Sequence, residues 1–305
     1  MDMYQKRKIR AEKKCDDNQQ SLSKVVINWY PGHMAKTKKQ IIEDLKLIDV
    51  IIEVLDARIP ISSQNPDVKQ YSKNKKRVVI LNKADLADEN ETKKWVKYFE
   101  NNEIPAVVTD ANSGKGINDV IKAVKKVYKE QQEKFASKGR IGKSIRIMIL
   151  GIPNVGKSSF INRITKKNTA QVGNRPGVTR QKQWIRVDNE IELMDTPGVL
   201  WPKFEDQQVG LKLALLGSVK DQVVNMDDLA LFACEYLMQE KPEIFDTVYH
   251  VKIADTPYET LQNIAIKRGY LLKGEIDENR LMLSFVKDIR ENKCGLITWE
   301  KPHVG

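Results

Sequence analysis

Gly151-Ile152-Pro153-Asn154-Val155-Gly156-Lys157-Ser158-Ser159 decides the fold of this chain, because it fits the phosphate-binding pattern G-x-x-x-x-G-K-[ST]. The apolar run 144–150 before it predicts a buried strand, and residues 159–164 predict the helix that leaves the loop. The glycines let backbone N–H groups turn toward phosphate oxygens, and the helix N-terminus favours anions. We expect Lys157 to reach the β- and γ-phosphates of a nucleotide and the Ser158 hydroxyl to ligate Mg²⁺. The alternative is a glycine-rich turn with a chance lysine. The loop residues expected to contact nucleotide are Asn154, Val155, Gly156, Lys157, Ser158 and Ser159.

Strands and helices alternate on both sides of this loop. Apolar runs predict strands at 49–55, 77–81, 104–109 and 144–150, and a hairpin at 183–187 and 191–194. Helical spacing predicts helices at 36–47, 89–101, 117–131 and 159–164. This alternation predicts an α/β fold with a doubly wound, mainly parallel six-stranded sheet.

The remaining chain divides into two parts of different character. Residues 1–27 are polar and basic without apolar periodicity, so we expect a mobile arm there. Beyond Trp201 the strand signal stops, and helical spacing predicts helices at 227–239, 257–267 and 277–292. The predicted domains are therefore an arm at 1–27, a nucleotide-binding domain at 28–205 and a small all-α domain at 206–305.

Asn82-Lys83-Ala84-Asp85 follows a predicted strand and matches N-K-x-D, the guanine-reading signature of GTPases. A carboxylate at Asp85 can accept two hydrogen bonds from guanine, and adenine offers no such pair, so a mismatch leaves the carboxylate unpaired. Asn82 is expected to reach the base and ribose edge and to brace the loop, and Lys83 to lie along the ring. Asp110-Ala111 occupies the place of a further loop whose backbone N–H contacts guanine O6, with Asp110 where serine is usual.

Asp195-Thr196-Pro197-Gly198 matches D-x-x-G, so Asp195 is expected to hold Mg²⁺ through water and the Gly198 N–H to meet the γ-phosphate. Thr179 is placed to be the second hydroxyl ligand of Mg²⁺, in a basic loop at 166–182 that we expect to become ordered when a γ-phosphate is present. That loop is equally consistent with a flexible solvated segment and with an RNA contact. All five GTPase motifs are present, but the guanine-reading ones precede the phosphate loop. The order predicts a circularly permuted domain, whose old ends are rejoined by the polar linker at 134–143.

Composition narrows the class of protein. The chain of 305 residues carries a net charge of +11, with 40 basic against 25 acidic residues before position 206 and 12 against 16 from position 206 onward. Such a basic body favours a nucleic-acid partner, with a solubilising surface as the alternative. No run approaches the ~20 apolar residues that span a bilayer, and no apolar signal core is evident. Three scattered cysteines argue against disulfides and structural zinc, so we expect a cytoplasmic protein without membrane contact.

These motifs resemble the circularly permuted GTPases, and closely the ribosome biogenesis GTPase A family, over about residues 28–305. The segments that carry the resemblance are Trp29–Met34, Asp56–Pro60, Asn82–Asp85, the phosphate loop, Gly177–Thr179, Gly198–Lys203, Val209–Ala214 and Lys267–Gly269. The resemblance implies late assembly of the large ribosomal subunit and a helical domain that binds ribosomal RNA. RNA-binding candidates in that domain are Lys267, Arg268, Lys287, Arg290 and Lys293.

Three residues carry open alternatives. Val199 stands where many GTPases place a water-orienting Gln, so another group must act, and the resemblance points to His33 as catalytic; the alternative is a histidine that caps the following helix. Asn154 resembles the residue that holds K⁺ in potassium-dependent GTPases, against plain loop packing. Arg58 could stabilise charge or contact RNA, but a local pair with Asp56 is favoured.

Two functional hypotheses follow from different classes. The favoured one is a Mg²⁺-dependent GTPase, K⁺-stimulated and ribosome-stimulated, that binds GTP and GDP and helps to mature the large ribosomal subunit. The other is an RNA-binding protein that uses GTP only as a structural ligand. A nucleotide-dependent kinase is a weak third hypothesis, because the sequence offers no evident acceptor site or lid.

Overall fold

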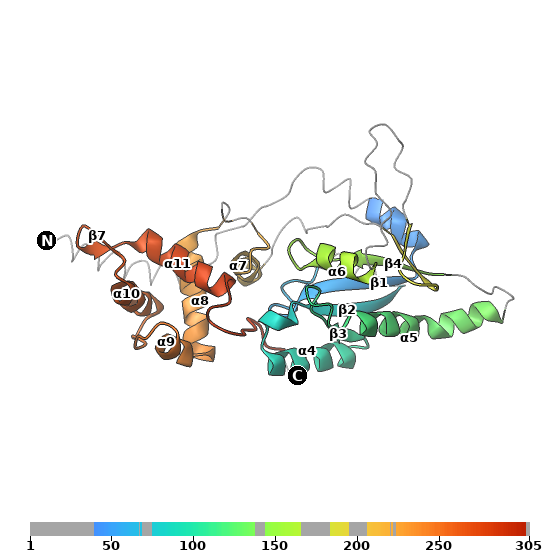
Figure 1. Ribbon diagram of the computed structural model, residues 1–305, viewed down its shortest axis with the longest axis horizontal. Helices are drawn as coiled ribbons and strands as arrows, with labels where there is room; N and C mark the ends of the chain where they lie inside the picture. Colours follow the sequence, from blue (N-terminus) through green and yellow to red (C-terminus); the bar gives the residue numbers. More distant parts are fainter. Residues whose placement is uncertain are drawn as a thin grey trace, which may run out of the picture.

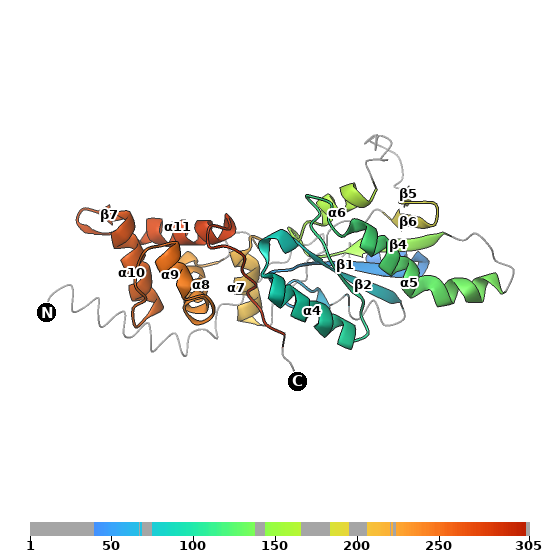
Figure 2. The same ribbon diagram turned by 60° about the horizontal axis from the view of Figure 1, so that its bottom comes forward.

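The computed structural model describes residues 40–66, 68, 75–137, 144–165, 184–194, 206–219, 221 and 224–302. Figures 1 and 2 show a sheet with flanking helices in one half of the molecule and a group of helices in the other, with α7 between them. The predicted arm at 1–27 and the first four residues of the predicted helix at 36–47 lie outside the described residues. Within the described part of that helix, residues 40–44 are helical and Leu45–Leu47 forms a 3-10 turn.

Strand β1 (Val50–Asp56) lies inside the sheet and pairs in parallel with β2 (Lys76–Asn82) on one side and β4 (Ile145–Leu150) on the other. All seven of its residues are buried, as expected for a parallel strand covered on both faces. The whole sheet has the order β3-β2-β1-β4-β6-β5, completed by β3 (Ala106–Val108), β6 (Ile191–Met194) and β5 (Trp184–Arg186). Only the β5–β6 pair is antiparallel, so the predicted six-stranded, mainly parallel sheet is confirmed.

The order of connections creates the place where a ligand can bind. The chain runs outward from β1 through β2 to β3, then crosses back to β4 on the other side of β1. In open α/β sheets such a reversal leaves a crevice at the carboxyl ends of the strands. The loops after β1, β2 and β4 all open at this edge, and they hold the nucleotide motifs.

Alternate residues along each strand lie on opposite faces of the sheet, because successive side chains point to opposite sides. Val50, Ile52 and Val54 pack in one cluster with side chains of α5 (Ile117–Ala136) and α6 (Lys157–Ile164). On the opposite face, Leu55, Val79 and Leu81 pack against Trp95 and Phe99 of α4 (Glu89–Asn101). A third cluster joins Ile51 and Met148 to Ile41 and Leu45.

Two helices compare closely with the prediction, and one runs longer. Helix α4 has the predicted bounds because the Asp88 carboxylate caps it, accepting hydrogen bonds from the backbone N–H groups of Asn90 and Glu91. Helix α6 begins two residues earlier than expected, at Lys157. Helix α5 continues past the predicted end at residue 131 to Ala136, because its last residues are good helix formers. The linker therefore begins after 136 rather than at 134.

The C-terminal region is helical, as predicted. It contains α7 (Gln207–Leu215), α8 (Met226–Glu240), α9 (Glu243–Thr247), α10 (Pro257–Arg268) and α11 (Glu278–Arg290). The expectation that strands stop beyond Trp201 misses one short hairpin, β7 (Leu271–Leu272) with β8 (Glu275–Ile276). Lys273 and Gly274 join the two strands with positive φ at both positions, the geometry of a two-residue hairpin turn. None of the described helices combines the length and hydropathy needed to cross a bilayer.

Candidate nucleotide-binding site

The phosphate loop has the strand–loop–helix context that the motif requires. Strand β4 ends at Leu150, and α6 begins at Lys157. Between them Asn154 has φ 64° and Gly156 has φ 87°, so the backbone turns sharply into the helix. Such turns, together with a helix N-terminus, orient N–H groups toward an anion. The Ser158 side chain is exposed in the first turn of α6.

Gly156 approaches Asn82 so closely that no side chain fits there. A Cβ at Gly156 would lie 2.3 Å from Asn82 Nδ2. Asn82 Nδ2 donates to the Val155 carbonyl at 2.8 Å, while Asn82 Oδ1 accepts from Thr109 Oγ1 at 3.1 Å and from the Ala111 N–H at 3.0 Å. Asn82 is 1% exposed, and its amide is occupied at both ends. It therefore joins the phosphate loop to both base-site loops, as its predicted bracing role requires; its contact with base and ribose stays a prediction.

The rest of the guanine motif forms an open turn after β2. Lys83 adopts a left-handed conformation with φ 60°, and Ala84–Leu86 makes a 3-10 turn tied by the Ala84 N–H to the Thr109 carbonyl at 3.2 Å. Asp85 is exposed, and its carboxylate forms no hydrogen bond or ion pair with the residues that the structure describes. An unengaged, exposed carboxylate at this edge is suited to reading a base.

Lys83 is linked to the loop after β1 through Asp56. Lys83 Nζ lies 3.0 Å from Asp56 Oδ2, and the same carboxylate accepts from Arg58 Nε at 2.9 Å and Nη2 at 2.7 Å. Burial by itself would raise the pKa of Asp56, but its hydrogen bonds and attraction to Arg58, with help from Lys83, hold that pKa below its ordinary value. The favoured pairing of Arg58 with Asp56 is confirmed, and the arginine is 7% exposed.

Asp110 closes the second base-site loop in place of the usual serine. Its carboxylate accepts from the Asn112 N–H at 2.8 Å and the Ser113 N–H at 3.2 Å. Burial would raise the pKa of Asp110, but hydrogen bonding to the Ser113 side chain, together with these backbone N–H groups, lowers it overall. Arg163 of α6 donates to the Ala111 carbonyl at 3.2 Å and to the Asn112 carbonyl, so this loop is tied to the phosphate-loop helix. The Ala111 N–H already donates to Asn82, and the contact of this loop with guanine O6 stays a prediction.

Asn154 makes a contact that the sequence did not indicate. Its Nδ2 donates to the Gly217 carbonyl at 2.5 Å, in the turn that follows α7. The amide oxygen of Asn154 is the kind of donor that K⁺ accepts, so the residue fits the predicted cation role while its nitrogen bonds the C-terminal region. The exposed Ser158 hydroxyl is likewise a hard oxygen of the kind Mg²⁺ prefers. In the described ranges, no group of three or more His, Cys, Asp or Glu side chains could hold a metal.

Several predicted site residues lie outside the described residues. They are His33, Thr179, Asp195 and Gly198, together with Val199. The residues that the structure brings together are Asn82, Lys83, Ala84, Asp85, Asp110, Ala111 and the phosphate loop.

Four of the five RNA-binding candidates have acidic neighbours within the C-terminal region. Arg268 Nη1 contacts the buried Asp288, which Lys293 Nζ also contacts at 2.9 Å. Lys287 lies 3.6 Å from Glu291. Arg290 forms hydrogen bonds of 2.7 and 3.0 Å with Asp221. Lys267 is exposed, and no such pair is recorded for it with another described residue. These pairs offset positive charge, which reduces the attraction of four candidates for phosphate.

Sequence reasoning missed a segment after α11 that returns to the sheet half of the molecule. Trp299 donates its backbone N–H to the Arg58 carbonyl at 2.7 Å, and Glu300 binds the same loop. The one sequence signal was the apolar group Leu296, Ile297 and Trp299.

Comparison with known proteins supports the motif assignment. Residues 146–262 match the family described as "50S ribosome-binding GTPase". The chain is 45% identical over 280 residues to ribosome biogenesis GTPase A of Bacillus licheniformis, covering 91% of this chain and 99% of that protein. It is 32% identical to ribosome biogenesis GTPase A of Thermotoga maritima, and the alignment covers 90% of this chain and 95% of that protein. The structure of GNP-bound YlqF from T. maritima aligns with a TM-score of 0.59 at 28% identity, covering 88% of this chain and 99% of that one, and the GDP-bound structure aligns at 0.60.

Proposed function

This chain belongs to the ribosome biogenesis GTPase A family, and from that premise we propose that it binds and hydrolyses GTP as an assembly factor for the large ribosomal subunit. The observation that carries the proposal is the position of Asn82. One buried amide joins the phosphate loop, at Val155, to the base-site loop at Ala111. Motifs that are far apart in a permuted sequence are thus brought together around one space at the carboxyl ends of the strands.

The chemistry follows from the groups around that space. Lys157 and the N–H groups of the loop would neutralise phosphate charge, with the greatest effect where charge develops in the transition state. Asp85 would select guanine. Ser158, Thr179 and Asp195 would hold Mg²⁺, which would supply positive charge to neutralise the phosphates. K⁺ would be held by the amide oxygen of Asn154.

The switch proposed here uses the γ-phosphate. Thr179 and the Asp195–Gly198 loop would respond to its presence, and that loop leads along the chain into α7 of the C-terminal region. His33 would act in hydrolysis, because Val199 cannot orient water. The GTP state would in this way be communicated to a helical region that contacts ribosomal RNA through the five candidates Lys267, Arg268, Lys287, Arg290 and Lys293, with the cytoplasm as the site of action.

The decisive measurement is GTP turnover by the full chain with purified large subunits, small subunits or free ribosomal RNA. We expect GTP turnover to rise with large subunits but not with small subunits or free ribosomal RNA. The increase should be greater in potassium than in sodium. Lys157→Ala is the matched negative variant, and it should abolish turnover or weaken GTP binding in every condition. Equal rates in all mixtures, with RNA binding intact, would instead favour the passive RNA-binding protein that holds GTP as a structural ligand.

A further inference from the structure

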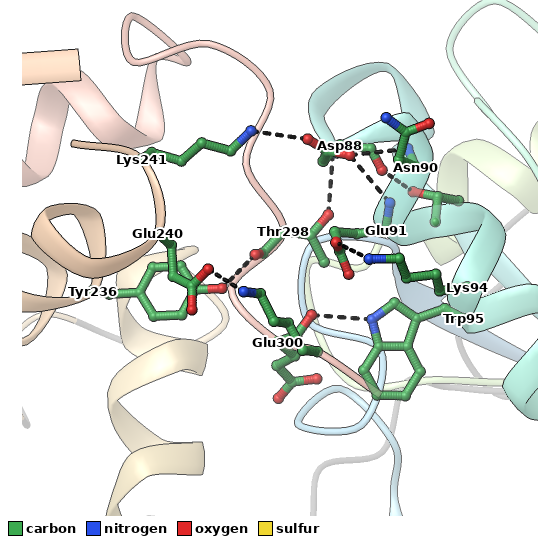
Figure 3. Close-up of polar contacts among 12 residues, drawn as sticks. Asp88, Asn90, Glu91, Lys94, Trp95, Tyr236, Glu240, Lys241, Thr298 and Glu300 are labelled. Carbon is green, nitrogen blue, oxygen red and sulfur yellow. Dashed lines mark hydrogen bonds and ion pairs between the residues drawn. The ribbon is translucent and has the colours of Figure 1, made fainter. Parts of the chain in front are cut away.

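The segment Ile297–Glu300, here called the strap, leaves the helical region and lies buried between the two halves of the molecule. Its four residues are between 1% and 7% exposed. Figure 3 shows Thr298 and Glu300 of this segment between Tyr236 on one side and Asp88 and Trp95 on the other. A buried terminal segment must satisfy its polar groups with protein partners, and the strap does so on three elements.

The first element is the loop after β1. The Trp299 N–H donates to the Arg58 carbonyl at 2.7 Å. The Glu300 carboxylate accepts from the Ile61 N–H at 2.7 Å and the Ser62 N–H at 3.0 Å, and it also accepts from the Ser62 hydroxyl. Hydrogen bonds to an ionised acceptor are stronger than neutral ones, so this loop is held firmly.

The second element is the turn that follows the guanine motif. The Asp88 N–H donates to Thr298 Oγ1 at 3.1 Å, and Trp95 Nε1 donates to the Glu300 carbonyl at 3.1 Å. Asp88 is three residues beyond Asp85 and caps α4 with its side chain. Thr298 therefore contacts a residue that lies one short turn from Asp85, the carboxylate proposed to read guanine.

The third element is the helical region itself. The Tyr236 hydroxyl of α8 donates to the Thr298 carbonyl at 2.7 Å, and its ring lies 5.0 Å from that of Trp299. Lys212 of α7 lies 3.4 Å from the Glu300 carboxylate. Lys241, at the end of α8, contacts Asp88 directly at 3.0 Å. Helices α7 and α8 thus contact the strap on the side opposite the sheet half of the molecule.

The strap contacts the loop after β1 and the turn that ends at Asp88. Lys83 and Asp85 lie near both of these contacts. One loop leads to them through Asp56, which pairs with both Arg58 and Lys83. The other leads to them through Asp88. We propose that the strap is a positioning element of the guanine-reading turn, so that docking of the helical region and binding of the guanine base are thermodynamically coupled. This inference rests on the proposed guanine specificity and adds a regulation of that same site.

The coupling has a required reciprocal. If docking of the strap raises affinity for guanine nucleotide, then nucleotide must stabilise the docked strap by the same factor. A partner that draws the helical region away would accordingly weaken nucleotide binding. The phosphate loop is joined to the helical region separately through Asn154, so the base-dependent part of the coupling belongs to the strap.

The test compares GDP with IDP, which lacks the exocyclic amine that Asp85 is proposed to read. Thr298→Val removes the acceptor for the Asp88 N–H while keeping the side-chain shape, and Thr298→Ser restores it. Glu300→Gln weakens the hold on Ser62. Tyr258→Phe removes a 2.6 Å hydrogen bond to Glu278 within the helical region and serves as the remote control.

We expect Thr298→Val and Glu300→Gln to lower the GDP-to-IDP affinity ratio by about 5-fold, the factor for one hydrogen bond. Thr298→Ser and Tyr258→Phe should keep the parent ratio. Hydrogen exchange at the Ser62 and Asp88 amides should slow when GDP is added to the parent. If Glu300→Gln fails to fold, the Thr298 pair alone decides.

Two failures are distinguishable. A parent protein that binds ADP as well as GDP would overturn the proposed guanine specificity itself. A parent that prefers GDP, with an unchanged GDP-to-IDP ratio in folded Thr298→Val, would overturn the positioning role of the strap and leave the proposed function standing.

Discussion

The side-chain nitrogen of Asn154 lies 2.5 Å from the carbonyl oxygen of Gly217, so a residue of the phosphate loop bonds directly to the turn after α7. The same side chain carries the oxygen proposed to hold K⁺. The amide nitrogen thus bonds Gly217 while the amide oxygen is proposed to bind K⁺, and substitutions can separate these two roles.

Asn154→Asp keeps an oxygen for the cation but loses the donor to Gly217, whereas Asn154→Ala loses both. We expect the ratio of turnover in potassium to turnover in sodium to persist in Asn154→Asp and to fall to about one in Asn154→Ala. Hydrogen exchange in residues 206–219 should increase in both variants, because both lose the contact. A potassium response in Asn154→Ala equal to that of the parent would contradict the cation role.

Asp85→Asn should shift preference from guanine toward xanthine, because the new amide presents a donor to the 2-oxygen of xanthine. Competition binding with XTP and GTP measures the shift. Glu89→Gln is a suitable control, since Glu89 is an exposed carboxylate nearby whose ion pair with Lys93 lies on the surface of α4. GTP preference that is unchanged in Asp85→Asn would remove the guanine-reading role.

His33→Ala should keep GTP affinity and lose most of the turnover stimulated by large subunits. An imidazole that orients water or stabilises charge typically contributes ~10²–10⁴-fold. Binding of subunits in the presence of a non-hydrolysable GTP analogue should survive. His250→Ala is the control, because His250 is an exposed histidine whose ring contacts the Asp246 carbonyl in the helical region.

If His33→Ala matches the parent in stimulated turnover, the capping role stands instead of the catalytic one. If its GTP affinity falls, the histidine contributes to the nucleotide site through structure.

Asn82→Ala should destabilise the nucleotide-free protein. The substitution leaves three groups without their partner: the Val155 carbonyl, the Thr109 hydroxyl and the Ala111 N–H. Leaving such buried groups unsatisfied costs about 3 kcal/mol in free energy of unfolding. Urea denaturation measures the loss. Asn102→Ala also removes one side-chain hydrogen bond, to the Tyr98 carbonyl at 2.7 Å, but at an exposed helix end, where water replaces it. Equal losses in the two variants would contradict the bracing role of Asn82.

Much of the fold could be predicted because its signals are local. Asp88 marks the start of α4, and the apolar spacing of Trp95 and Phe99 marks its buried face. The strands of the sheet are apolar runs bounded by polar loops. The phosphate loop and Asn82–Asp85 each carry their chemistry within a few residues, so their assignment needed no knowledge of distant contacts.

Two of the missed features have weak local signals, and the third depends on a contact between distant residues. The polar linker was predicted to begin inside α5, since helix formers and linker residues have similar polarity. The short hairpin at Leu271–Ile276 lacks the length of a periodic strand. The pairing of Glu300 with Ser62 joins positions 238 residues apart, and no local pattern announces it.

That separation in sequence also determines the order in which these contacts can form during translation. During translation, Asp56 and Lys83 leave the ribosome well before Thr298 and Glu300, the residues whose side chains hold their loops. Contacts at such sequence separation form late, after the entropy of closing a very long loop has been overcome. A nascent chain can therefore complete its sheet before the turn proposed to read guanine is fully supported, so a tightly held nucleotide would mark a chain whose strap is already in place.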